Sequence, residues 1–256
     1  MTKGKDRIKS VKNILVSQPE PADDKSPYGI LAKKYGIKID FRPFIQVDPV
    51  GVKEFRKQKI DVLQHTAVIF TSRNAVDHYF ILMKELKIEM PPEMKYFCIS
   101  EQTSNYLAKY IVVRKRKIFT GEKTSSQLFD IIKKHKNEKY IFPCSDIRKD
   151  DIPEFLNKGG YKWSEAVIYR TVASDLSDLS DVNYDIIAFF SPSGIHSLLS
   201  NFPEFKQNNT RIAAFGPTTA LAVRDANLIL DIEAPLPNAP SMTGALELYI
   251  KKANDA

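Results

Sequence analysis

The chain has 256 residues, of which 43% are hydrophobic, and it carries a formal net charge of +7 at pH 7. This much apolar sequence can bury one large core or two modest ones. No run approaches the roughly 18 apolar residues of a membrane span, and the basic N-terminus lacks the apolar region of a secretory signal. We therefore expect a cytoplasmic protein that neither crosses nor binds a membrane.

The positive charge favours acidic partners, either nucleic acid or a carboxylate-rich small molecule. Five basic residues precede the first predicted strand and are expected to form a solvated tail: Lys3, Lys5, Arg7, Lys9 and Lys12. The run at 114–117 (Arg-Lys-Arg-Lys) is interpreted as a solvated approach to a strand, with a ligand patch as the alternative. No zinc-finger spacing, aromatic RNP motif or helix-turn-helix pattern occurs, so we do not expect a nucleic-acid partner.

Short apolar runs alternate with amphipathic segments along the chain, which is typical of α/β proteins. The runs predict strands at residues 13–17, 37–47, 68–70, 96–99, 118–119, 140–142, 166–172, 186–190, 212–215 and 228–230. Apolar residues at helical spacing predict helices at residues 28–35, 52–63, 75–86, 103–110, 152–157, 195–201, 219–224 and 242–251. A further helix is expected to begin in the capping box at 124–127 (Thr-Ser-Ser-Gln).

The predicted elements divide into two domains, with the second inserted into the first. Residues 48–163 contain a full set of α/β units, whereas residues 174–256 lack a first strand and helix, which residues 1–37 would supply. We therefore expect two flavodoxin-like parallel-sheet α/β domains, one formed by 1–37 with 174–256 and the other by 48–163. Residues 38–47 and 164–173 would join them as a two-stranded β hinge, and such a hinge implies a cleft.

Several common site motifs are missing from the sequence. Without a G-x-G-x-x-G motif, and with only 10 glycines, a dinucleotide site is not expected. The four histidines show no metal spacing, and no G-x-S-x-G nucleophile elbow occurs. Cys98 and Cys144 both end apolar runs and are expected to be reduced core residues. We expect neither a metal nor a cofactor.

Small hydroxyl residues follow four of the predicted strands, where each strand ends and a helix begins. They stand at 71–74 (Thr-Ser-Arg-Asn), 100–103 (Ser-Glu-Gln-Thr), 191–194 (Ser-Pro-Ser-Gly) and 216–219 (Gly-Pro-Thr-Thr). Any one of them can be an ordinary N-cap, which stabilises a helix by about 1 kcal/mol. Four such ends, on the edge where α/β sheets bind ligands, instead favour two halves that hold one polyanion through hydroxyl and backbone N–H groups.

Two further side chains are candidates for the same site. Tyr169 lies in the predicted return strand beside the expected cleft, where its phenol could donate a proton; packing in the hinge is the alternative. Arg148 follows the strand at 140–142 and could bind a carboxylate through two parallel hydrogen bonds. For Arg148 the alternative is a charge on a helix surface.

Together these motifs resemble the uroporphyrinogen-III synthase family. The matching segments are 70–76 (Phe-Thr-Ser-Arg-Asn-Ala-Val), 143–148 (Pro-Cys-Ser-Asp-Ile-Arg) with Gly160, 167–171 (Val-Ile-Tyr-Arg-Thr), 189–194 (Phe-Phe-Ser-Pro-Ser-Gly), 216–220 (Gly-Pro-Thr-Thr-Ala) and 240–241 (Pro-Ser). The resemblance extends over nearly the whole chain, including the order of the inserted domain. Ser100 and Ser145 depart from it, because the family often has glycine at these positions.

The resemblance implies a hydro-lyase of tetrapyrrole (porphyrin and heme) biosynthesis, which closes hydroxymethylbilane to uroporphyrinogen III with inversion of the last pyrrole ring and loss of water. It implies Tyr169 as the proton donor. The residues that it implies for gripping the substrate carboxylates are Thr71, Ser72, Arg73, Thr103, Ser145, Arg148, Ser191, Ser193, Gly194, Thr218, Thr219 and Ser241.

The resemblance implies no cofactor. It implies a monomer whose partner is a linear tetrapyrrole octacarboxylate, with a transient contact to the preceding enzyme of the pathway as a further expectation. The alternative is a non-catalytic binding or regulatory module with the same two-domain clamp. The departures at Ser100 and Ser145 are the features that favour this alternative.

Overall fold

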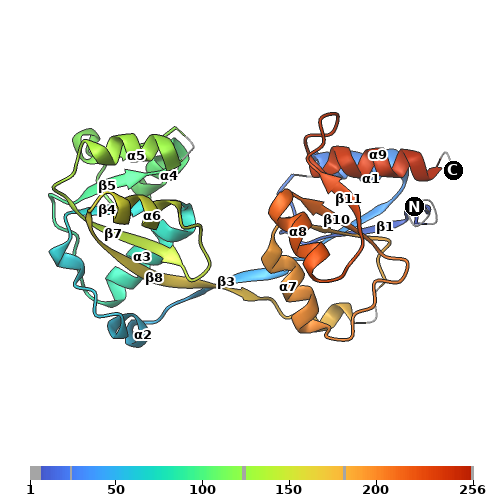
Figure 1. Cartoon of the computed structure of the whole chain (residues 1–256), viewed down its shortest axis with the longest axis horizontal. Coiled ribbons are helices and arrows are strands. Elements are labelled where there is room, and N and C mark those ends of the chain that lie inside the picture. The colour runs from blue at the N-terminus through green and yellow to red at the C-terminus, as the bar shows by residue number, and fades with distance from the viewer. Residues whose placement is uncertain (1–6, 24, 123–124, 181–182, 255–256) are drawn as a thin grey trace. The chain divides into compact units, whose positions relative to one another are not determined.

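The computed structural model describes residues 7–23, 25–122, 125–180 and 183–254, except for the side chains of Lys115 and Ser125. The chain divides into two compact units (Figure 1). Unit 1 comprises residues 1–46 and 172–256, and unit 2 comprises residues 47–171. Each unit is a mixed α/β structure built on a parallel sheet, which confirms the predicted fold class.

Unit 1 has a five-stranded sheet in the order β11-β10-β9-β1-β2, and all its neighbouring strands are parallel. The strands are β1 (Asn13–Val16), β2 (Lys38–Phe41), β9 (Ile186–Phe189), β10 (Arg211–Phe215) and β11 (Leu230–Ala234). Counted within the unit, this is the flavodoxin order 2-1-3-4-5. The early residues 13–41 supply the strands and the helix that residues 172–256 lack.

Helices cover both faces of this sheet, and each face has its own apolar core. The helices are α1 (Pro27–Tyr35), α7 (Pro192–Asn201), α8 (Pro217–Asp225) and α9 (Met242–Asn254), with a short 3-10 helix η4 (Ser177–Leu179). Leu31 of α1 and Leu246 of α9 share one core with Ile14 and Val16. The helices α7 and α8 pack on the other face, where the core includes Leu15, Leu198 and Val223. Alternate residues of β1 therefore face opposite layers, as in any doubly covered sheet.

Unit 2 contains most of a six-stranded sheet in the order β3-β8-β7-β4-β5-β6. Its strands are β3 (Ile45–Pro49), β4 (Ala67–Phe70), β5 (Lys95–Cys98), β6 (Ile118–Thr120), β7 (Lys139–Ser145) and β8 (Lys162–Ala173). The pairs from β8 to β6 are parallel. Counted from β4, these five strands follow the order 3-2-1-4-5, the other common order of doubly wound sheets, and β3 adds an edge strand. Unit 2 therefore lacks the flavodoxin-like strand order that was predicted for both domains.

The helices of unit 2 also form two layers. They are α2 (Val52–Lys57), α3 (Arg73–Glu85), α4 (Glu101–Tyr106), α5 (Ser125–Lys133) and α6 (Asp151–Lys158), with 3-10 helices η1 (Val62–Gln64), η2 (Leu107–Lys109) and η3 (Lys115–Lys117). Val76 and Tyr79 of α3 belong to the core on one face, and Ile132 of α5 and Leu156 of α6 to the core on the other. Thr124 of the predicted capping box lies outside the described residues.

Residues 38–47, predicted as one hinge strand, form two strands instead. β2 ends at Phe41 in the sheet of unit 1, and β3 begins at Ile45 next to β8. Pro43 stands between them and has no N–H to donate to a strand ladder, which explains the break. Phe44 is fully buried against Phe189, with ring centroids 5.6 Å apart. Both β3 and β8 run across the boundary between the units.

Two other predicted elements have different bounds. The helix expected over residues 52–63 ends at Lys57, because Lys59 has a left-handed backbone with φ of 55° that an α-helix cannot include. The strand expected over 228–230 begins only at Leu230 and runs to Ala234. Asn227, with φ of 56°, forms a left-handed turn between α8 and β11, so the strand begins later than predicted.

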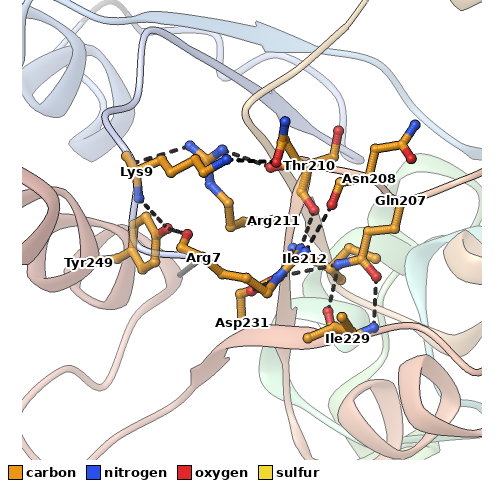
Figure 2. A network of polar contacts seen from close by, with 11 residues as sticks. Arg7, Lys9, Gln207, Asn208, Thr210, Arg211, Ile212, Ile229, Asp231 and Tyr249 are labelled. Atoms are coloured by element: carbon orange, nitrogen blue, oxygen red, sulfur yellow. Dashed lines mark hydrogen bonds and ion pairs between the residues drawn. The ribbon is translucent and has the colours of Figure 1, made fainter. Parts of the chain in front are cut away.

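Arg7 does not belong to a solvated tail. Its guanidinium binds both carboxylate oxygens of Asp231, at 2.5 and 3.0 Å, and donates to the backbone oxygens of Asn208 and Thr210 (Figure 2). The Asp231 side chain is only 5% exposed, so it needs a cation or several donors beside it. Lys9 also binds Asn209. Lys3 and Lys5 lie outside the described residues.

Lys117, expected to be solvated, is 7% exposed; it pairs with Glu93 and donates to the backbone oxygen of Pro92. Cys98 and Cys144 are buried free thiols, as predicted, and burial raises the pKa of each to about 12. Among the described residues, no helix combines the length and apolar character that a membrane crossing requires.

Candidate active site

The topology places one switch point in each sheet, where the strand order reverses direction. In unit 1 it lies between β1 and β9, and in unit 2 between β4 and β7. Ligands of open α/β sheets bind outside the carboxyl ends of the strands at such points. Residues beside these two strand pairs are therefore the strongest candidates for contact with a ligand.

At the switch point of unit 1, Ser17 follows β1 and Ser191 follows β9. Ser191 is the N-cap of α7, and its hydroxyl accepts from the backbone N–H of Gly194 at 3.3 Å. A Cβ on Gly194 would lie 3.3 Å from the Phe189 ring and 3.8 Å from the hydroxyl oxygens of both Ser17 and Ser191. The glycine therefore keeps this hydroxyl-lined turn open, and Ser193 follows Pro192 on the same first turn.

Ser17 is a residue that the sequence reasoning missed. It is 8% exposed, and its backbone N–H donates to Ala188 of the neighbouring strand. The signal was available, because Ser17 follows the apolar run of β1 in the way that Ser191 follows β9. Each of the four predicted strand ends is followed by more than one hydroxyl residue, whereas β1 is followed by Ser17 alone.

The N-terminus of α8 has no side-chain cap. Gly216 occupies the N-cap with φ of 89°, a conformation that favours glycine, and its N–H donates to Ala234. Thr218 is exposed on the first turn, whereas Thr219 is 1% exposed and packed inside. Of the two predicted threonines, Thr218 is therefore the one that is accessible at the surface. Ser241 is exposed too, but it caps α9 beyond the edge strand β11, two strands away from β9.

At the switch point of unit 2, Thr71, Ser72 and Arg73 follow β4. Ser72 is the N-cap of α3 and accepts from the N–H of Ala75 at 3.0 Å. The Arg73 guanidinium is exposed and lies 5.6 Å from the centre of the Tyr106 ring. Arg73 has no acidic partner in the part of the chain that the structure describes. The charge of Arg73 is thus available to an anion, while the Tyr106 ring limits its motion.

The next strand end, after β5, is less open. Ser100 caps α4 by accepting from the N–H of Thr103, and the two side-chain oxygens lie 3.2 Å apart. Thr103 is 4% exposed. The predicted ligand residue Thr103 is therefore mainly a structural partner of Ser100.

Tyr169 reaches the site through an irregularity in β8. Cys144 of β7 pairs with Val167, but Ser145 pairs with Tyr169, so Ile168 is an extra residue on β8. Such a bulge changes the face to which the following side chain points. Ile168 and Tyr169 consequently both contact the core on the α3 side, although neighbours in a regular strand face opposite sides.

The Tyr169 phenol lies beside His78 of α3 and near Ser72, the N-cap of the same helix. The ring of His78 lies against it, with centroids 5.1 Å apart and an interplanar angle of 32°. Tyr169 is 9% exposed, and this burial raises the pKa of its phenol, while the nearby Ser72 hydroxyl acts in the opposite direction. Burial also lowers the pKa of His78, against a smaller effect of Asp77. At neutral pH the site therefore holds a protonated phenol beside an uncharged imidazole.

Ser145 and Arg148 are engaged by other residues of unit 2. The Ser145 hydroxyl donates to Asp146 at 2.9 Å and lies 3.2 Å from the Thr171 hydroxyl. Arg148 forms ion pairs with Glu165 and Asp150, which raise the pKa of its guanidinium. Arg148 was predicted either to bind a ligand carboxylate or to be a charge on a helix surface. Its guanidinium binds two carboxylates of the protein instead. Among the described residues, no cluster of three His, Cys, Asp or Glu side chains could hold a metal ion.

Comparison with known proteins agrees with this fold and these motifs. The model of the family described as uroporphyrinogen-III synthase HemD matches residues 27–244. The chain belongs to the uroporphyrinogen-III synthase family. The uroporphyrinogen-III synthase of Saccharomyces cerevisiae is 31% identical over 123 residues, an alignment that spans 43% of this chain and 45% of the yeast protein. The chain thus covers less than half the length of this curated relative.

Solved structures of family members share the fold. The synthetase of Helicobacter pylori 26695 matches 94% of this chain and 99% of its own with a TM-score of 0.61 and 19% identity. A mutant synthase of the extremely thermophilic bacterium Thermus thermophilus gives a TM-score of 0.56 and 16% identity over the same shares. The resemblance that the sequence motifs indicated is confirmed.

Proposed function

We propose that this protein closes hydroxymethylbilane to uroporphyrinogen III, with inversion of the last pyrrole ring and loss of water. Family membership supports the reaction. Within the structure, the observation that carries it is the phenol of Tyr169, which a bulge in β8 places against the N-terminal part of α3. A phenol that is held in this way can act as a proton donor, whereas a freely exposed tyrosine is not held in one position.

Accessible groups at the carboxyl ends of the strands bind the substrate carboxylates. Thr218 and the first-turn N–H groups of α8, which follows β10, act in unit 1 together with Ser193 of α7. In unit 2, Arg73 binds a carboxylate and Thr71 supports it. Helix N-termini suit anions, because their free N–H groups and the helix dipole both favour negative charge. The caps Ser72 and Ser191 hold these helix ends in place.

Tyr169 protonates the leaving hydroxyl of the bilane. The C–O bond breaks, water departs, and the pyrrole that carried the hydroxymethyl group becomes a cationic azafulvene. The last ring attacks it through the carbon that already bears the bridge to the third ring, which gives a spirocyclic intermediate. The bond from that carbon to the bridge then breaks, and the bridge bonds to the other α-carbon of the last ring. When the ring system closes, a ring carbon releases a proton, which restores the phenol, so the net loss is one water. The uncharged His78 suits this cation better than an imidazolium would, since like charges repel.

Orientation is the main task of such an enzyme. The bilane loses its hydroxyl readily and closes unaided to the uninverted isomer, so the protein must impose the geometry of inversion rather than supply a strong nucleophile. We further propose that the protein acts in the cytoplasm as a monomer on this octacarboxylate. Transient contact with the preceding enzyme of the pathway would deliver the unstable substrate.

Isomer analysis tests this function. Freshly generated hydroxymethylbilane is incubated with and without the protein, and the products are separated as type I and type III uroporphyrinogens. We expect mainly type III with the protein and type I without it. Type I product at the spontaneous rate, with bilane bound to the protein, would instead indicate the non-catalytic binding module.

A further inference from the structure

Unit 2 contains a second candidate site, at the opposite end of its strands from Tyr169. A pocket of about 740 Å³ opens beside the amino ends of β5 and β6, where it is lined by Met94, Tyr96 and Ile118. The predicted substrate residues follow the carboxyl ends of the strands, about 13 Å away along a four-residue strand. The pocket is therefore separate from the proposed active site.

The wall of the pocket is apolar and adaptable. Phe80 and Met83 of α3 form one side, and Met90 and Met94 of the segment before β5 form another. Methionine side chains are flexible and polarisable, so they accommodate apolar ligands of different shape. The volume lies within the range of about 300–1,000 Å³ that is typical of small-molecule sites.

The rim of the pocket is basic. Lys84 and Arg114 line it, and both side chains are exposed. In the described part of the chain, neither forms an ion pair or a hydrogen bond with a protein group. Lys117 also lines the pocket, but its ammonium group is 2.9 Å from the Glu93 carboxylate. Glu89 is the acidic residue of the lining, so free positive charge exceeds negative charge at the mouth.

Exposed apolar residues surround the same opening. Val112 is 84% exposed and Ile81 is 47% exposed, and both line the pocket. Leaving such side chains in water is unfavourable by about 25 cal/mol per Å² of apolar surface, a cost that an apolar ligand would remove. The basic run at 114–117, unused by the proposed reaction, thus begins at the mouth of an apolar pocket.

We propose that this pocket binds a small amphipathic anion, an aliphatic or aromatic carboxylate. Its apolar body fills the space between the methionines, and its carboxylate lies at the mouth between Lys84 and Arg114. A strongly hydrated polyanion such as a nucleotide does not suit the site, because the wall offers mainly carbon and sulfur atoms. The inference is independent of the proposed synthase activity.

Methionine-methyl NMR tests the proposal directly, with decanoate as the probe. Three of the five methionines line the pocket, and Met242 lies in unit 1 as an internal control. We expect saturable shifts of the Met83, Met90 and Met94 methyl signals, with the Met242 signal unmoved. Absence of these shifts, or equal shifts at Met242, overturns the proposal.

Charge reversal at the rim tests the anionic part. Lys84→Glu/Arg114→Glu should weaken the binding of decanoate at least about tenfold, because the carboxylate loses its ion pairs. The affinity for neutral 1-decanol should stay within about twofold, because this probe forms no ion pair. The matched control is Lys53→Glu/Lys136→Glu, two exposed lysines of unit 2 away from the pocket. Equal weakening of decanoate in both double variants, or none in either, would show that Lys84 and Arg114 do not hold the carboxylate.

Discussion

At the scale of single residues, the environment of Tyr169 decides what the site can do. Its phenol is nearly buried, its pKa is raised by that burial, and the His78 ring and the Ser72 hydroxyl lie beside it. A general acid must hold its proton until the substrate is in place, and a raised pKa meets that requirement. Removal of one oxygen atom tests this role without disturbing the ring packing.

Tyr169→Phe should reduce the rate of type III formation by about 100-fold or more, the usual contribution of a general acid. The free energy of unfolding should change little, because the ring keeps its contacts with His78. Product isomers and urea unfolding are measured on the same preparation. A variant with an unchanged type III rate would show that another group donates the proton.

His78 makes unit 2 sensitive to acid. Burial lowers its pKa below the ordinary 6.5, so the unfolded chain binds a proton first as the pH falls. Stability is therefore lost as the pH falls below about 6.5, and the loss is complete below the folded pKa. His78→Phe should keep the ring contact and make the slope of stability against pH shallower between about pH 7 and 5; His135, whose pKa is also lowered, leaves a residual slope.

The fluorescence of Trp163, the single tryptophan of the chain, follows this unfolding transition, since Trp163 lies in unit 2. His196→Phe, an exposed position in unit 1, is the control and should leave the slope unchanged. If His78→Phe and the native chain have the same slope, His78 is not the group that titrates.

At the scale of elements, the helix N-termini at the strand ends have two separable tasks. Ser72, Ser100, Ser191 and Ser241 each accept a hydrogen bond from their own helix and act as caps. Thr218 makes no such bond in the described structure and is exposed. These four serines therefore stabilise their helices, whereas the Thr218 hydroxyl on the first turn of α8 has no capping role.

Ser191→Ala and Thr218→Ala should separate these tasks. Loss of the cap in Ser191→Ala should lower the free energy of unfolding by about 1 kcal/mol. Thr218→Ala should leave stability within about 0.5 kcal/mol, as is usual for surface positions, and raise KM for the bilane. Circular dichroism in urea and initial rates give the two values. An unchanged KM in Thr218→Ala would show that Thr218 does not bind the substrate.

At the scale of the whole molecule, segments distant in sequence complete unit 1. β1, α1 and β2 come before the inserted unit, and the remaining elements come after it. Arg7 reinforces this closure, because it ties the chain start to Asp231 of β11 across 224 sequence positions. Tyr249 of α9 donates to the backbone oxygen of Arg7 as well.

Arg7→Ala should destabilise unit 1 by about 2–4 kcal/mol, since it leaves the carboxylate of Asp231 buried without its cation. The exposed ion pair of Lys38 with Asp40 provides the contrast: Lys38→Ala should cost at most about 1 kcal/mol. Asp231→Asn in the Arg7→Ala background should recover part of the loss. If Arg7→Ala costs no more than Lys38→Ala, the network does not stabilise the chain.

The α/β class, most strands and helices, and the four hydroxyl-rich strand ends could be predicted from the sequence, because they follow from local apolar periodicity and capping residues. The order of neighbouring strands could not, and the position of Ser17 at a switch point depends on that order. Nor could the bulge that turns Tyr169 toward His78, the ion pairs of Arg148 with Glu165 and of Arg7 with Asp231, or the burial of Thr219. These features depend on contacts between residues far apart in the chain. The apolar periodicity of a segment contains no information about such contacts.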